Sequence, residues 1–255
     1  MIDRTAVILC GGKGTRLGLL GKKAPKTLLK VHGKPILWYI IKFLQKNSFN
    51  HFILPVGFKG KKITKYINKE KTLKKLNIKI INTGENTSIS QRIHKIIKFI
   101  KSENFILLNG DAIFNFNIKK IYLDHLKQNN IVTFLGSHAL MPYGVVGTKG
   151  KKIISFSRDT KFNAIISQHK KKFIGYIYSG ISLMNKKILK SNFKSYKNFE
   201  KKFYPLIIKR YKCGFHNIDG FWSSVDNQKD LELLNKKNNK FNYRNVEKLR
   251  KYLIK

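Results

Sequence analysis

In the first half of the chain, short runs of apolar residues alternate with longer segments whose apolar positions recur at helical spacing. A short apolar run between turn signals is typical of a buried strand, and such runs occupy residues 6–9, 52–56, 78–81 and 105–108. Apolar residues at helical spacing predict helices that begin at Pro35, cover residues 61–73 and extend from residue 88 to residue 100. Strands that alternate with helices in this way predict a parallel sheet covered by helices on both faces.

The second half of the chain follows a less regular pattern. Apolar stretches predict strands at residues 131–135, 143–146, 153–156 and 174–183. Helical spacing predicts helices at 199–209 and 228–234, and Pro205 is expected to kink the first of these or to begin a new one. The sequence contains no recognisable repeat or linker, only a polar tail after Asn235. This pattern favours one compact α/β unit with an elaborated C-terminal half.

The composition is that of a folded protein. The chain has 255 residues, of which 42% are hydrophobic, so it can bury enough apolar surface to offset its conformational entropy. No apolar run approaches the ~20 residues that a membrane span requires, and no secretory signal is recognisable. The two cysteines, Cys10 and Cys213, are too few for a disulfide framework or a four-ligand zinc site. A cytoplasmic location is therefore the expectation.

The charge of the chain is strongly positive. Lys and Arg number 53 against 13 Asp and Glu, which gives a formal net charge of +40. Such an excess attracts polyanions, so it is compatible with nucleic acid, with a membrane surface and with small anionic substrates. A solvated surface rich in lysine and asparagine is the simpler interpretation, because the sequence has no RNP-type aromatic motif, no zinc finger and no single basic helix. We therefore expect no specific nucleic-acid partner.

A glycine-rich loop follows the first predicted strand. The segment L-C-G-G-K-G-T-R-L at residues 9–17 places Lys13 and Arg16 among three glycines. Glycines let the backbone approach a ligand and point successive N–H groups at an anion, so this position is typical of a phosphate-binding loop. The segment lacks the third glycine of a dinucleotide fingerprint and the Ser or Thr of a P-loop. An ordinary glycine turn is the alternative interpretation.

Several motifs taken together resemble those of the sugar-1-phosphate nucleotidyltransferases. The shared motifs are G-G-K-G-T-R-L at 11–17, P-K-T-L at 25–28, G-K-P-I at 33–36, G-F-K-G at 57–60 and F-W-S-S-V-D at 221–226. The segment T-G-E-N-T-S-I-S-Q-R-I at 83–93 resembles one found in glucose-1-phosphate cytidylyltransferases. It departs from that pattern at residues 89–91, where I-S-Q replaces threonine and two glycines. The resemblance covers residues 6 to about 234 and is closest to the cytidylyltransferase branch.

The resemblance carries expectations for fold and activity. It implies a mixed, mostly parallel, doubly wound (Rossmann-like) α/β sheet of the nucleotidyltransferase type. Residues 1–235 would form a single nucleotidyltransferase domain, and residues 236–255 a basic C-terminal tail or helix. The implied reaction transfers a nucleotidyl group from a nucleoside triphosphate, with CTP favoured, to a sugar-1-phosphate, with Mg²⁺ as cofactor. The products are a nucleotide-sugar and pyrophosphate, and the sequence is compatible with a homo-oligomer.

The resemblance also implies roles for individual residues. Arg16, Lys26 and Asp111 would act in catalysis, and Asp111 and Asp226 would bind Mg²⁺, which prefers a small number of carboxylate ligands. The residues implied in nucleotide binding are Gly11, Gly12, Gly14, Thr15, Arg16, Gly84, Thr87, Arg92 and Gly110. Those implied in binding the sugar phosphate are Tyr143, Gly144, Arg158, Ser179 and Gly180. Taken singly, Asp111 is equally well read as a turn residue and Asp226 as the N-cap of the helix predicted at 228–234.

One family motif is missing from this chain. Where the family has E-K-P after a strand, residues 154–159 read I-S-F-S-R-D, and Arg158 or Lys161 would replace only the positive charge. Two alternatives therefore stay open: a guanylyltransferase for heptose- or mannose-1-phosphate, favoured by Y-G-V-V at 143–146 and Y-S-G-I at 178–181, and a catalytically weakened nucleotide-binding regulatory relative. A polyanion-binding protein is a third alternative, which rests on the charge alone.

The remaining conspicuous residues are expected to be structural. Cys10 is expected to be a packed thiol, and Trp38 and Trp222 are expected to pack in the core or at its rim. The seven histidines show no metal-ligand spacing. His94 and His125 are expected to lie on helices as surface residues.

Overall fold

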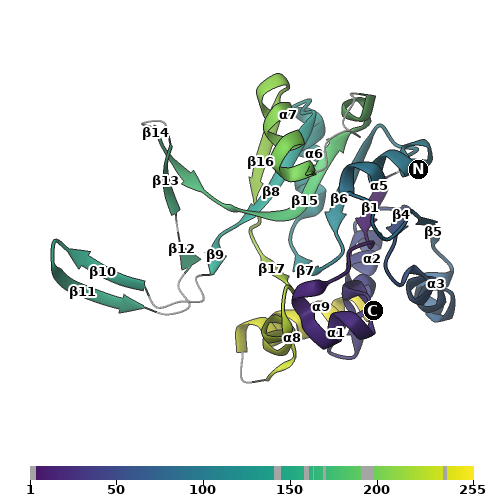
Figure 1. The fold of residues 1–255 in the computed structure, drawn as a ribbon, viewed down its shortest axis with the longest axis horizontal. Helices are drawn as coiled ribbons and strands as arrows, with labels where there is room; N and C mark the ends of the chain where they lie inside the picture. The colour runs from purple at the N-terminus through teal and green to yellow at the C-terminus, as the bar shows by residue number, and fades with distance from the viewer. Residues whose placement is uncertain are drawn as a thin grey trace.

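The structure is a computed structural model. It describes residues 4–140, 145–157, 161–162, 164–168, 171–190, 198–237 and 240–255. Its centre is a seven-stranded sheet with the strand order β16-β8-β15-β6-β1-β4-β5, and helices cover both faces of this sheet (Figure 1). The mixed, mostly parallel, doubly wound α/β fold expected from the sequence is therefore confirmed.

The parallel part of the sheet consists of the predicted apolar runs. β1 (Thr5–Leu9) lies between β4 (His51–Val56) and β6 (Asn104–Asn109), and β5 (Asn77–Asn82) pairs with the other side of β4. The four strands run in the same direction. Because parallel strands end at the same edge of a sheet, the segments that follow β1, β5 and β6 converge there.

An antiparallel strand joins the second half of the chain to the first. β15 (Ile177–Asn185) pairs antiparallel with β6 and also with β8 (Val132–Ser137). β16 (Cys213–Asn217) runs parallel to β8 at the edge of the sheet. The second half therefore extends the same sheet rather than building a separate one.

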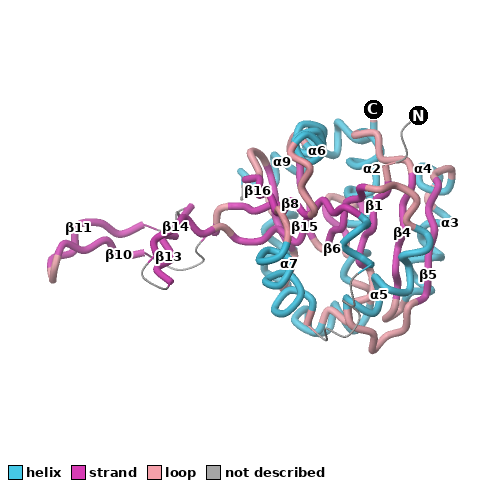
Figure 2. Tube along the Cα trace, turned by 90° about the horizontal axis from the view of Figure 1, so that it is seen from above, coloured by secondary structure: helices cyan, strands magenta, loops and turns pink. Residues whose placement is uncertain are grey.

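Three short antiparallel pairs extend from the body of the molecule (Figure 1), and Figure 2 shows two of them from above. They are β9 (Ala139–Leu140) with β12 (Lys161–Phe162), β10 (Val145–Lys149) with β11 (Lys152–Ser157), and β13 (Ala164–Gln168) with β14 (Lys171–Gly175). The predicted single strand at 174–183 is wrong, because its first residues belong to β14 and the rest to β15. The apolar run is continuous in sequence, but its hydrogen-bond partners change after Gly175.

Side chains along the parallel strands alternate between two apolar layers. In β1, Ala6 and Ile8 face one layer and Val7 faces the other. Helices of the first layer include α2 (Ile36–Lys46), α3 (Gly60–Lys69), α6 (Ile118–Lys127) and α9 (Lys240–Ile254). Helices of the second layer include α5 (Ile89–Ile96) and α7 (Tyr204–Arg210).

The helix predicted at 61–73 is divided into α3 and α4 (Lys71–Lys74). Glu70 between them has an extended backbone, with φ −76° and ψ 106°. Its carboxylate accepts hydrogen bonds from Lys34 Nζ (3.1 Å) and Thr72 Oγ1 (3.0 Å). These contacts favour a break at Glu70 that the apolar spacing does not reveal.

The helix predicted at 199–209 also has two parts. Residues Phe199–Phe203 form a π-helical turn, and α7 begins at Tyr204. Pro205 therefore stands in the first turn of α7, where its missing N–H leaves no helical hydrogen bond unmade. Of the two outcomes expected for Pro205, the structure has the new helix.

The surface position expected for His125 is wrong. His125 lies on a helix, α6, as expected, but the residue is only 1% exposed. Its Nδ1 lies 2.8 Å from Thr133 Oγ1 and its Nε2 lies 3.1 Å from Asn104 Oδ1. Because the amide oxygen only accepts, Nε2 donates to it and Nδ1 accepts from the threonine. Burial lowers the pKa of His125 to about 4, so the ring is neutral at pH 7.

The basic C-terminal segment, which the sequence left open between a tail and a helix, contains the helix α9. Val246, Leu249 and Leu253 of α9 are buried in the first layer, where the helix contacts α2 and α8 (Gln228–Asn235). Among the residues that the structure describes, no helix is both long enough and apolar enough to cross a membrane.

Candidate active site

The glycine loop, which we define as residues 10–14, leaves the end of β1 and crosses the edge of the sheet. Cys10 N donates a hydrogen bond to Pro55 O in β4 (3.2 Å), and the Cys10 side chain is buried, which raises the pKa of its thiol. Gly14 has a φ of 61°, a left-handed conformation that favours glycine. A Cβ on Gly12 would meet no other atom within 4 Å, so the loop leaves open space above this residue.

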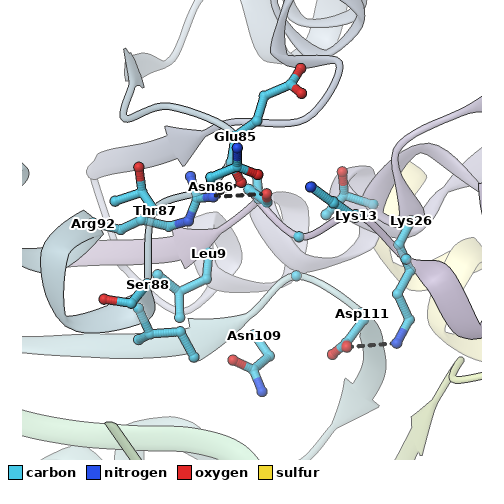
Figure 3. Close-up of a pocket in the computed structure, with 17 residues that line it drawn as sticks. Leu9, Lys13, Lys26, Glu85, Asn86, Thr87, Ser88, Arg92, Asn109 and Asp111 are labelled. Carbon is cyan, nitrogen blue, oxygen red and sulfur yellow. Dashed lines mark hydrogen bonds and ion pairs between the residues drawn. The ribbon is translucent and has the colours of Figure 1, made fainter. Parts of the chain in front are cut away.

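A cavity of about 560 Å³ opens beside the glycine loop (Figure 3). Its wall consists of residues 9–14, 85–89 and 109–111, together with Lys26, Thr27 and Arg92. The three segments follow β1, β5 and β6 respectively. The cavity therefore lies at the edge where the carboxyl ends of the parallel strands meet, which is the usual place for a ligand in an open α/β sheet.

Most of the residues expected to bind the nucleotide lie in this wall. They are Gly11, Gly12, Gly14, Thr87, Arg92 and Gly110. Thr15, Arg16 and Gly84 are not part of the wall. Arg16 has a side chain that is 82% exposed, and its Nη1 lies 3.9 Å from Asp226 Oδ1. Gly84 has a φ of 94°, and a Cβ there would lie 2.8 Å from Thr87 Oγ1, so this glycine allows the turn that carries Thr87.

The wall also contains polar residues to which the resemblance assigned no role. They are Thr27, Glu85, Asn86, Ser88 and Asn109. The last four follow the strands predicted at 78–81 and 105–108. Polar residues just beyond the ends of parallel strands were therefore the signal that could have identified them.

Lys26 lies between the two predicted metal carboxylates. Its Nζ is 2.8 Å from Asp111 Oδ2 and 2.9 Å from Asp226 Oδ1, and the Asp111 contact is visible in Figure 3. The side chain is 16% exposed. Burial alone would lower the pKa of Lys26, but the two carboxylates outweigh this effect and raise the pKa above its ordinary value. Lys26 is therefore a charged ammonium group held by two anions.

Strand pairing explains how Asp111 and Asp226 meet. β7 (Ala112–Asn115) pairs antiparallel with β17 (Phe221–Ser224), in a register that sets Ala112 opposite Ser224. The ladder continues one step further, since Val225 N donates to Asp111 O (2.8 Å). Each aspartate therefore stands at the end of its strand, beside the end of the other strand.

The orientation of Asp226 is fixed by its neighbours. Ser224 Oγ donates to Asp226 Oδ2 (3.0 Å), and the backbone N–H of Asp226 donates to Asp230 Oδ2 (2.7 Å). Asn227, not Asp226, is the N-cap of α8, in a capping box with Asp230. The alternative that made Asp226 the cap is therefore wrong, and the N-x-x-D spacing at 227–230 was the local signal against it. Burial would raise the pKa of Asp226, but hydrogen bonding and attraction from Lys26 lower it below its ordinary value.

The donor set fits a hard divalent cation such as Mg²⁺. Asp111 and Asp226 already share one positive group, and carboxylate oxygens are the ligands that Mg²⁺ prefers. Among the described residues, no group of three or more His, Cys, Asp and Glu side chains is arranged to hold a metal. A bound ion would therefore take further oxygen ligands from phosphate and water.

The residues expected at the sugar phosphate are less completely described. Tyr143, Gly144 and Arg158 lie outside the described residues. Ser179 and Gly180 lie at an irregularity in the pairing of β15 with β8, a feature common beside active sites.

Of these two residues, only Gly180 adjoins the cavity wall. Gly180 has a φ of 74°, and a Cβ there would lie 2.7 Å from Nδ2 of the wall residue Asn109. The hydroxyl of Ser179 is buried and donates to Leu135 O (2.7 Å), so it is committed within the sheet.

Comparison with known proteins identifies the family and supports the fold. The family described as nucleotidyl transferase matches residues 5–239. A probable glucose-1-phosphate cytidylyltransferase of Bacillus subtilis (strain 168) is 29% identical over 254 residues, which cover 91% of this chain and 94% of that protein. A D-glycero-α-D-manno-heptose 1-phosphate guanylyltransferase of Campylobacter jejuni is 34% identical over 122 residues, which cover 48% of this chain and 54% of that protein.

A solved structure has the same fold. The crystal structure of HddC from Yersinia pseudotuberculosis aligns with a TM-score of 0.68 at 22% identity and covers 96% of this chain and 98% of its own. At this identity the likeness concerns the fold alone. The family match extends over nearly the whole chain and includes the glycine loop, Lys26 and both aspartates. This chain belongs to the nucleotidyl transferase family.

Proposed function

We propose that this nucleotidyltransferase uses CTP as its donor and a sugar-1-phosphate as its acceptor, and that Mg²⁺ is its cofactor. The observation that carries this proposal is the position of Lys26 Nζ, which contacts both Asp111 and Asp226 beside the glycine loop. A phosphate-binding loop, an ammonium group and a pair of carboxylates are the parts that the transfer of a phosphoryl-type group requires.

The reaction needs no nucleophilic side chain. An oxygen of the sugar phosphate, already an anion at pH 7, forms a bond to the α-phosphorus of the triphosphate. The bond between the α-phosphorus and the oxygen that bridges to the β-phosphate breaks, and pyrophosphate leaves with that electron pair. The enzyme therefore has to align two polyanions and neutralise their charge, which is a task for positioned N–H donors and cations.

The chain supplies these groups from both sides of the cavity. Backbone N–H groups of residues 11–14 and the cation of Lys13 would bind the triphosphate, in the manner of other glycine-rich loops. Lys26 would stand beside the α-phosphate and the sugar phosphate. Arg16, exposed and close to Asp226, would neutralise the leaving pyrophosphate.

Asp111 and Asp226 would hold Mg²⁺. When bound, the ion would supply positive charge to the phosphate oxygens of the donor. The remaining work belongs to the chain: Ser224 and Asp230 keep Asp226 turned toward Lys26, and the β7–β17 pairing keeps Asp111 beside it.

CTP is favoured for two reasons. Residues 83–93 resemble the corresponding cytidylyltransferase segment, and the Bacillus subtilis relative matches along nearly its whole length. GTP with a heptose- or mannose-type phosphate is the second candidate, supported by the 34% identity to the Campylobacter jejuni guanylyltransferase over part of the chain. The close contact among Lys26, Asp111 and Asp226 argues against a weakened regulatory relative.

Pyrophosphate release tests the proposal. The protein is assayed with CTP, GTP, UTP and ATP, each against glucose-, mannose- and heptose-1-phosphate, with and without Mg²⁺. We expect release only with Mg²⁺, and fastest with CTP. Lys26→Ala and Asp111→Asn should abolish release, whereas Lys30→Ala, an exposed lysine in the same segment, should not. Fastest release with GTP would contradict the assignment of CTP as the donor. Release that survives Lys26→Ala would contradict the placement of the active site at Lys26.

A further inference from the structure

Arg92 is a buried cation with an unusual set of partners. The residue is 5% exposed and lies on α5, in the wall of the cavity. No carboxylate in the described part of the chain lies within ion-pair distance of it. A buried charge without a partner is costly, so its hydrogen bonds must stabilise it. These hydrogen bonds indicate the role of Arg92.

Both terminal nitrogens of the guanidinium group donate hydrogen bonds to acceptors within the protein. Nη1 donates to Val56 O (3.3 Å) and Thr83 Oγ1 (2.5 Å), and Nη2 donates to Gly11 O (3.0 Å) and Glu85 O (3.2 Å). Thr83 Oγ1 in turn donates to Val56 O (2.8 Å), so its lone pairs are free to accept from Arg92. The two terminal nitrogens carry four hydrogens, and four acceptors take them. Only the Nε hydrogen is left for a ligand.

Two glycines provide the space for this group. A Cβ on Gly11 would lie 2.1 Å from Nη1 and 2.3 Å from Cζ of Arg92. A Cβ on Gly57 would lie 2.6 Å from Nη1. Any larger residue at either position would push the guanidinium from its place. Arg92 and these glycines therefore form one packed unit, although they are far apart in the sequence.

The contacts of Arg92 join two loops of the cavity wall. Gly11 belongs to the glycine loop, and Glu85 belongs to the loop at residues 83–88, which we call the second loop. Each accepts one hydrogen bond from the same nitrogen, Nη2. A planar group with fixed donor directions sets the separation between its acceptors, which a flexible lysine does not do.

We infer that Arg92 is a positioning residue, which fixes the distance between the glycine loop and the second loop and does not read the base of the nucleotide. This inference rests on the proposed function in placing a nucleotide in the cavity. It replaces the role that the family resemblance implied for Arg92, a contact with the nucleotide. The charge of Arg92 still favours a polyanion, because no carboxylate among the described residues forms an ion pair with it.

The first test measures the loops without any nucleotide. Arg92→Lys keeps the charge but lacks the planar fork of donors that fixes the spacing between acceptors on the two loops. We expect backbone hydrogen exchange at residues 10–14 and 83–88 to become at least roughly tenfold faster than in the unmodified protein, with exchange in β8 and β16 unchanged. Unchanged exchange in both loops would overturn the inference.

The second test separates positioning from reading of the base. A positioning residue acts on every nucleotide, so Arg92→Lys should weaken binding of CTP and GTP, measured by calorimetry, by the same factor. A selective loss, in which the ratio of the two dissociation constants changes by more than roughly threefold, would assign Arg92 to the base and overturn the inference.

A third measurement uses the glycines and needs only folding stability. Gly11→Ala should lower the melting temperature in the presence of Arg92 and lower it much less in an Arg92→Ala background, because the clash is then relieved. Gly12→Ala is the matched control, since a Cβ there meets nothing within 4 Å, and its effect should be the same in both backgrounds. Additive effects for Gly11→Ala would contradict the inference. These readouts involve no catalysis, so they remain informative even if the proposed reaction fails.

Discussion

Asp111 and Asp226 share the ammonium group of Lys26, at 2.8 Å and 2.9 Å respectively. In the absence of ligand, the lysine therefore provides the positive charge that two neighbouring carboxylates require. The pKa of Lys26 is raised and that of Asp226 is lowered, so both of these groups are charged around neutral pH. The site is thus preorganised for a cation before substrate arrives.

Replacement of Lys26 by Met should strengthen metal binding to the nucleotide-free protein. The substitution keeps an apolar stem but removes the charge that competes for both carboxylates. We expect Mn²⁺, detected by electron paramagnetic resonance, to bind roughly tenfold more tightly than to the unmodified protein, which corresponds to about 1.4 kcal/mol. Lys30→Met, an exposed lysine nearby, serves as the control and should leave the affinity unchanged. Equal or weaker binding to Lys26→Met would show that the lysine does not compete with metal.

Asp230→Ala should reduce both stability and turnover. Asp230 accepts hydrogen bonds from the backbone N–H groups of Asp226 (2.7 Å) and Asn227 (3.1 Å), so its loss removes half of a capping box and frees Asp226 to move. We expect a loss of roughly 0.5–2 kcal/mol in the free energy of unfolding, the usual range for a helix cap. The kcat should fall more than KM changes, because Asp226 is proposed to act on the reacting phosphates. Lys229→Ala on the same helix is the control, and a kcat that stays at the unmodified value would argue against a positioning role for Asp230.

Stability should fall with pH below about 6.5 because of His125. Its pKa is about 4 in the folded protein against 6.5 for the free side chain, so between these values the unfolded chain binds a proton that the folded chain does not. Stability from this residue is therefore complete above pH 6.5 and is lost as the pH falls toward 4. The loss should be about 2 kcal/mol by pH 5. Melting curves of the unmodified protein and His125→Gln should diverge in this window, and parallel curves would exclude His125 as the cause.

Gly110→Ala should displace the segment that carries Asp111. A Cβ on Gly110 would lie 2.6 Å from Thr27 Cγ2 and 2.8 Å from Leu9 O, so the added methyl group has no room. We expect a destabilisation of roughly 1–3 kcal/mol, typical of overpacking, together with a large loss of pyrophosphate release. Thr27→Ser removes the nearer of the two clashing atoms, so it should partly restore stability to Gly110→Ala. If the second substitution restores nothing, the clash with Thr27 is not the cause.

Local sequence pattern predicted the parallel half of the fold well. The apolar runs at 6–9, 52–56 and 105–108 became central strands, because a strand buried on both faces needs apolar residues at every position. The run at 78–81 became β5, the partly exposed strand at the edge of the sheet. The breaks at Glu70 and after Gly175 could not be predicted in this way. Each depends on which distant residue supplies a hydrogen bond, and apolar spacing does not encode that choice.

The sequence predicted several residues of the candidate site but not the contacts that join them. The motif resemblance identified Lys26, Asp111 and Asp226 as candidate site residues. In the structure, both aspartates contact the ammonium group of Lys26. The β7–β17 register that brings the aspartates together is a long-range pairing, which no local pattern specifies. The same holds for Arg92, since its four acceptors lie up to 81 residues away from it in the sequence.

The β7–β17 pairing also bears on when the active site can form during synthesis on the ribosome. Lys26 precedes Asp226 by 200 residues, so the glycine loop and the parallel strands emerge long before the second carboxylate does. A nascent chain can therefore fold the glycine loop and the parallel strands early. It still lacks Asp226, the second carboxylate that contacts Lys26. We expect the proposed active site to be complete only when β17 pairs with β7, late in synthesis.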